Sequence, residues 1–108
     1  MLDDTIARLE ARLRDSGSLA AENREELLSL LRQLKQELAT LEATHSEEAR
    51  DITDHTERFT AAAGERQPDV VKSSFDELAE SVAGFENSHP QLVQIVNRIA
   101  TTLSNLGI

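Results

Sequence analysis

The hydrophobic residues of this chain recur at alternating steps of four and three positions, which is the spacing of helices that pack side by side. The pattern runs without a slip through positions 27–62 and again through 71–85. A shorter stretch with similar spacing lies near the N-terminus, at Ile6, Leu9 and Leu13. This pattern predicts an all-α protein.

Turn signals divide the pattern into separate helices. Ser, Gly and Asp at 15–18 end the first helix, and "GERQPD" at 64–69 separates the second from the third. Pro90 suits the first turn of a helix and disfavours helical backbone in the residue before it. The predicted helices cover about 3–15, 21–63, 69–87 and 90–106.

The two longest parts of the chain have matching lengths. The second helix has about 42 residues and the last two together about 38, or about 63 and 57 Å at 1.5 Å per residue. Joined by a short turn, they form an antiparallel helical hairpin, a coiled coil whose return arm is kinked near Pro90. Position numbers that face each other then sum to about 133, so each apolar layer meets an apolar layer.

The predicted seam of this hairpin also provides the expected contact between copies of the chain. Val93, Ile95 and Ala100 make the last helix apolar over a wider face than a two-helix seam needs. We therefore expect a homodimer in which two hairpins form a four-helix bundle. The seam residues are Leu27, Leu31, Leu34, Leu38, Leu41, Ile52, Phe59, Phe75, Leu78, Val82, Phe85, Leu92, Val96, Ile99, Leu103 and Leu106.

Polar residues interrupt this seam at His45, Glu48 and His55. The hairpin register places His45 opposite His89, with Glu48 one layer away. In one structural interpretation, polar seam residues fix register and oligomeric state. In another, Glu48 and His55 point to water.

Two functional interpretations compete with these. His45, Glu48 and His89 form a divalent metal site, or the two histidines become charged below about pH 6.5 and push the arms apart. Di-metal helical bundles use Glu-x-x-His from two helices, whereas this chain has the reverse order once. We adopt the register interpretation, with no assigned metal or cofactor.

The composition of the chain indicates which kinds of molecule it is expected to bind. The chain has 108 residues, a formal net charge of −9, three Phe and no Trp or Tyr. A core with few large side chains favours self-association. The negative charge and the absence of a basic cluster argue against binding to nucleic acid or to an anionic membrane surface.

Other sequence features point to a cytoplasmic protein without enzymatic activity. The chain has no cysteine, and no apolar run approaches the length of a membrane span. The acidic start "MLDDTIARLE" differs from a secretory signal. Phosphate-binding loops, nucleophile elbows and His-Glu-x-x-His zinc motifs are absent from the sequence.

The C-terminal stretch "FENSHPQLVQIVNRIATTLSNLGI" resembles a family of short bacterial proteins known as domain of unknown function 4404. The similar features are Phe85-Glu86, His89-Pro90 and the ending Leu106-Gly107-Ile108. The stretches "ENREELLSLLRQLKQEL" and "LEARLRDSGSL" are similar to its other helices, whereas 42–68 differs. The resemblance implies a small helical bacterial protein and supplies no activity.

Together, these observations predict a structural or protein-interaction module that acts through self-association. An unidentified protein partner is compatible with this role. The alternative is a metal- or pH-responsive helical bundle that uses His45, Glu48 and His89.

Overall fold

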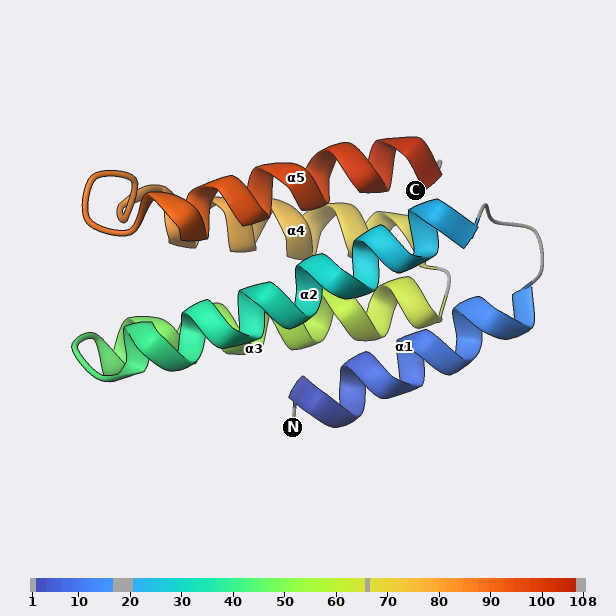
Figure 1. Ribbon diagram of the computed structural model, residues 1–108, viewed down its shortest axis with the longest axis horizontal. Helices are drawn as coiled ribbons and strands as arrows, with labels where there is room; N and C mark the ends of the chain where they lie inside the picture. Colours follow the sequence, from blue (N-terminus) through green and yellow to red (C-terminus); the bar gives the residue numbers. More distant parts are fainter. Residues whose placement is uncertain (1, 17–20, 66, 107–108) are drawn as a thin grey trace.

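The computed structural model of the protein describes residues 2–16, 21–65 and 67–106. The described residues form helices and turns without a β-strand, which confirms the all-α class (Figure 1). Within them the helices are α1 (Leu2–Ser16), α2 (Ala21–Glu42), α3 (Ser46–Gly64), α4 (Pro68–Ala83) and α5 (Pro90–Leu106).

Helices α2 to α5 form an antiparallel four-helix bundle within one chain (Figure 1). α2 packs against α3 and α5, and α4 packs against the same two helices, so the four helices close into a ring. α1 lies outside this ring and packs against α2 and α3. The bundle follows the up-down-up-down order that short connections favour.

The prediction of one continuous helix over 21–63 is wrong, because the chain reverses at Ala43–His45 (Figure 1). The Leu41 carbonyl accepts hydrogen bonds from the N–H groups of Thr44 and His45, at 3.1 and 2.8 Å. The Thr44 hydroxyl donates to the same carbonyl at 3.4 Å. These bonds satisfy the end of α2 within a turn.

Burial explains why the chain reverses there. In an extended hairpin, each arm of about 60 Å would cover only one face of the other arm. Folding the hairpin in half lets four helices surround one core. We call the apolar positions spaced by four and three residues the apolar stripe. The reversal falls at the first polar position of this stripe, which leaves His45 half-buried and Glu48 exposed.

The second reversal separates α4 from α5. α4 ends at Ala83, so the last residues of the helix predicted over 69–87 form a turn instead. Within this turn, the N–H of His89 donates to the carbonyl of Phe85 at 2.7 Å. α5 then begins at Pro90, where the missing N–H costs no helical hydrogen bond.

The helix pairs keep the predicted hairpin register. The ring centroids of Phe59 and Phe75 lie 5.5 Å apart between α3 and α4. Those of His45 and His89 lie 6.0 Å apart at the two reversals. The structure is therefore the predicted hairpin folded in half, with α3 paired to α4 and α2 paired to α5.

The core contains most of the residues predicted for the seam. Phe75 and Phe85 are partly buried against this core, while the side chain of Leu106 lies outside the described part. α1 adds Leu2, Ile6, Leu9 and Leu13. The buried members of the predicted seam are Leu27, Leu31, Leu34, Leu38, Leu41, Ile52, Phe59, Leu78, Val82, Leu92, Val96, Ile99 and Leu103.

The wide apolar face of 90–106 is used inside the chain. Of the three residues that widen this face, Ile95 is buried and Val93 and Ala100 are half-buried, and α5 packs against α2 and α4. Among the large hydrophobic side chains that the structure describes, Val70 is the exposed one. The face that led us to expect a dimer is thus partly covered within the chain, and the dimer itself stays a prediction.

In the described part of the chain, no helix combines the length and the apolar character needed to cross a membrane.

Candidate functional site

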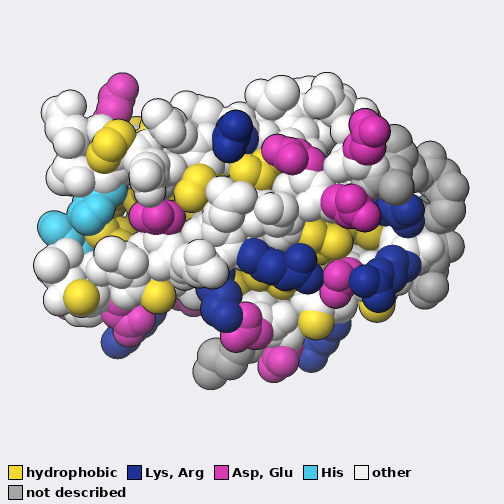
Figure 2. Space-filling view, viewed as in Figure 1, with side chains coloured by type: hydrophobic (Ala, Val, Ile, Leu, Met, Phe, Trp, Pro, Cys, Tyr) yellow, Lys and Arg dark blue, Asp and Glu magenta, His cyan; other side chains and the backbone are white. Residues whose placement is uncertain are grey.

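Three rings meet where the two chain reversals come together. His45 lies between α2 and α3, and Phe85 and His89 lie between α4 and α5. The ring of His45 lies 5.4 Å from that of Phe85, and the ring of Phe85 lies 5.8 Å from that of His89, with edge-to-face geometry. Figure 2 shows histidine side chains gathered at this end of the molecule. We call His45, Phe85 and His89 the ring cluster.

The ring cluster does not extend into a metal site. Glu48 is exposed on the first turn of α3. Within residues 2–16, 21–65 and 67–106, no three His, Cys, Asp or Glu side chains are grouped to hold a metal ion. The structure therefore brings His45 and His89 together and leaves Glu48 outside the pair. Nδ1 of His45 instead lies 2.9 Å from the Thr44 hydroxyl.

His55 has a different environment from the one expected at a water-facing seam position. Its ring is half-buried, and Nδ1 lies 3.2 Å from Oε2 of Glu77 on α4. The same carboxylate lies 3.7 Å from Nη1 of Arg58. Nδ1 of His55 is buried and has no hydrogen-bond geometry with any described residue. This contact lies between α3 and α4, and it is an ion pair when His55 is protonated.

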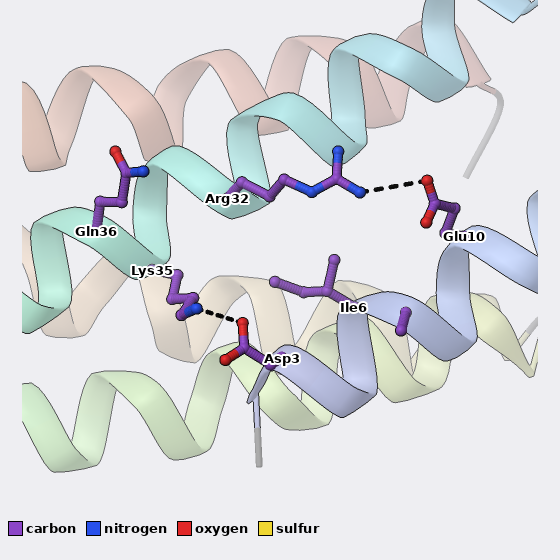
Figure 3. Close-up of a pocket in the computed structure, with 7 residues that line it drawn as sticks. Asp3, Ile6, Glu10, Arg32, Lys35 and Gln36 are labelled. Carbon is purple, nitrogen blue, oxygen red and sulfur yellow. Dashed lines mark hydrogen bonds and ion pairs between the residues drawn. The ribbon is translucent and has the colours of Figure 1, made fainter.

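A hollow of about 330 Å³ lies between α1 and α2, and we call it the α1–α2 hollow. Arg32 and Lys35 reach from α2 to acidic residues of α1, on either side of Ile6 (Figure 3). Nη2 of Arg32 lies 3.2 Å from Oε2 of Glu10, and Lys35 pairs with Asp3. Figure 2 shows lysine and arginine side chains along this face. The charges that reach across this hollow are thus paired within the protein.

A second hollow, of about 370 Å³, lies between α2 and α5, and we call it the α2–α5 hollow. Its walls carry mainly carboxamides, with one carboxylate and one guanidinium on opposite helices. In the part of the chain that the structure describes, neither Glu37 nor Arg98 has an ion-pair partner. The lining residues are Gln33, Gln36, Glu37, Gln91, Gln94, Ile95 and Arg98.

Sequence reasoning missed the α2–α5 hollow. A signal was present, because Gln33 and Gln36 are three positions apart, as are Gln91 and Gln94. Residues three apart share one side of a helix. The pairing of α2 with α5 then brings both sets of carboxamides to the same groove.

A family model described as "Domain of unknown function (DUF4404)" matches residues 62–108, a little under half of the chain. This match confirms the resemblance of the C-terminal stretch, whereas "ENREELLSLLRQLKQEL" and "LEARLRDSGSL" lie outside the matched residues. The matched part contains α4, α5 and the turn between them. Neither a curated protein nor a solved structure matches the chain. The description of the family names no activity.

Proposed function

We propose that this protein is a non-catalytic structural and protein-interaction module that acts through self-association. Two copies associate by exchanging their α3–α4 halves. Each bundle of the dimer then combines α2 and α5 of one chain with α3 and α4 of the other. This is the predicted dimeric four-helix bundle, reached from the folded chain by opening two turns.

The single observation that carries this proposal is the phase of the apolar stripe. It continues in steps of four and three across the first reversal, from Leu41 through His45 to Ile52. It also continues across the second reversal, from Val82 through His89 to Leu92. A stripe that stays in phase supports a straight arm as well as a folded one. A chain selected only for the folded form has no need of this phase.

The energetic difference between the two forms is confined to the reversals. In an exchanged dimer the same core layers form, but between chains instead of within one chain, which makes exchange a low-cost route to a dimer. The folded form gains the hydrogen bonds within the two turns, while the hairpin register places His45 opposite His89 in both forms. The dimer gains helical hydrogen bonds at 43–45 and is favoured by higher protein concentration.

The test is native mass spectrometry of the full chain over a range of concentrations. We expect monomer and dimer, with the dimer fraction rising with concentration. Mixing unlabelled and ¹⁵N-labelled dimers then separates exchange from surface association. Exchanged dimers form mixed dimers slowly, since every transfer requires a bundle to open. A monomer at all concentrations, or mixed dimers that form within the mixing time, would contradict the proposal.

A further inference from the structure

The two hollows beside α2 differ in how their charges are satisfied. Arg32 and Lys35 cross the α1–α2 hollow to paired carboxylates of α1. In the α2–α5 hollow, Glu37 lies on one wall and Arg98 on the other, and no ion pair joins them in the described part of the chain. We propose that the α2–α5 hollow binds a short peptide with a free amino terminus and a free carboxyl terminus.

The two charged residues match the two ends of such a peptide. The Glu37 carboxylate accepts hydrogen bonds from an ammonium group, and the Arg98 guanidinium forms a forked pair with a carboxylate. A simple anion would be attracted by Arg98 and repelled by Glu37. A simple amine would be attracted by Glu37 and repelled by Arg98. A ligand that carries both charges is therefore favoured over either one alone.

The carboxamides are complementary in hydrogen bonding to the main chain of such a peptide. A carboxamide offers N–H donors and a carbonyl acceptor, which complement the carbonyl and the N–H of a peptide bond. α2 contributes one pair of these groups and α5 the other, so the ligand lies between two polar walls. A free amino acid lacks an internal peptide bond for them to contact. The four residues are Gln33, Gln36, Gln91 and Gln94.

The size and the remaining lining residue agree with a small peptide. The volume of about 370 Å³ falls within the range of about 300–1,000 Å³ that small-ligand pockets occupy. Ile95 is buried and supplies an apolar surface among the polar groups.

This inference is independent of the exchange proposed above. α2 and α5 would remain a pair within one chain in the exchanged dimer, so the hollow would exist in both forms. If the protein does not self-associate, the binding proposal is unaffected. If no peptide binds, the self-association proposal is unaffected.

The experiment uses three probes that differ only at their ends, namely triglycine, N-acetyl-triglycine and triglycinamide. Each is titrated into the full, ¹⁵N-labelled chain, and the side-chain amide signals of the glutamines are followed by NMR. We expect triglycine to shift these signals and to bind roughly threefold more tightly than either blocked peptide, because each exposed charge contact has a modest effect. L-glutamine, titrated in parallel, tests a free amino acid as the ligand.

Two variants test which residue of the protein contacts each end of the peptide. Glu37→Gln should weaken triglycine but leave N-acetyl-triglycine unchanged, since the blocked peptide has no ammonium group. Arg98→Gln should weaken triglycine but leave triglycinamide unchanged. Glu25→Gln and Arg50→Gln are matched controls at exposed positions outside the hollow, and neither should change binding.

Three outcomes would overturn the proposal. The first is the absence of glutamine shifts up to the solubility limit of triglycine. The second is equal binding of all three peptides, because the ends would then play no part. The third is a response to L-glutamine as strong as that to triglycine, since this would make the ligand a free amino acid.

Discussion

The two chain reversals that meet at the ring cluster are built differently. The one between α4 and α5 has Gly84 at its start and Pro90 at its end, both residues that commonly terminate or begin helices. The one between α2 and α3 spans 43–45 and has neither residue type. Its turn rests on hydrogen bonds to the Leu41 carbonyl and on the packing of α3 against α2.

This difference shows that one turn is encoded locally and the other by tertiary contacts. A proline lacks the N–H that would continue a helix, so α5 begins at Pro90 in the folded form and in the exchanged form alike. The first reversal exists because folding the hairpin buries more apolar surface than a straight arm does. It is therefore the turn that small sequence changes should open or close.

The largest effect is expected from Ser46→Pro, which fixes the first reversal. Ser46 is the exposed first residue of α3, where proline fits without loss of a helical hydrogen bond. In a continuous helix the same proline would cost about 3 kcal/mol. We expect the variant to be monomeric by native mass spectrometry at every concentration, with unchanged or slightly raised thermal stability. A dimer as abundant as in the parent chain would show that exchange does not straighten this turn.

The next effect is expected from Thr44→Ala combined with His45→Leu, which favours a straight arm. These changes remove the hydroxyl bond to Leu41, raise helix propensity and place leucine at the interrupted seam position. Together they favour the exchanged dimer by about 2 kcal/mol per chain. Light scattering should show a larger dimer fraction at equal concentration.

A control for that double variant is Thr40→Ala. Thr40 is exposed within α2, and its hydroxyl donates to a backbone carbonyl of the same helix at 3.3 Å. The change therefore gives a similar gain in helix propensity away from the turn. An equal rise in dimer from Thr40→Ala would attribute the effect to general helix stability and not to the reversal.

The smallest effect is expected from Gly84→Ala in the locally encoded reversal. Gly84 has φ −66° and ψ −12°, a backbone that alanine adopts without strain. An added Cβ would meet no described atom within 4 Å. The change should raise stability by up to about 1 kcal/mol in thermal unfolding and alter the dimer fraction little, because Pro90 still interrupts the helix in both forms. A conversion to dimer as large as that of the double variant would remove the distinction between the two turns.

The sequence predicts the helices and their partners well where the cause is local. The heptad spacing indicates the buried faces, and Pro68 and Pro90 mark the starts of two helices. The facing pairs Phe59–Phe75 and His45–His89 follow from matching the apolar layers. These features depend on residues a few positions apart, which a single sequence displays directly.

The first reversal could not be predicted in the same way. Ala43, Thr44 and His45 are all tolerated within helices, and the stripe keeps its phase through them. The gain from folding the hairpin in half depends on the packing of four helices at once. The α2–α5 hollow has the same origin, since Glu37 and Arg98 are far apart in sequence and line one hollow only when the ring closes.

The closed ring also sets the order in which a growing chain can fold. α3 ends at Gly64 and α4 begins at Pro68, so the two helices are close in sequence and can pair as soon as both have emerged from the ribosome. α2 and α5 are the first and last helices of the ring, and their pairing closes the longest loop. The leucines of α2 therefore cannot pack against α5 until nearly the whole chain has been synthesised. We therefore expect a nascent copy to expose this surface, which the helices of a second copy would cover under the proposed exchange.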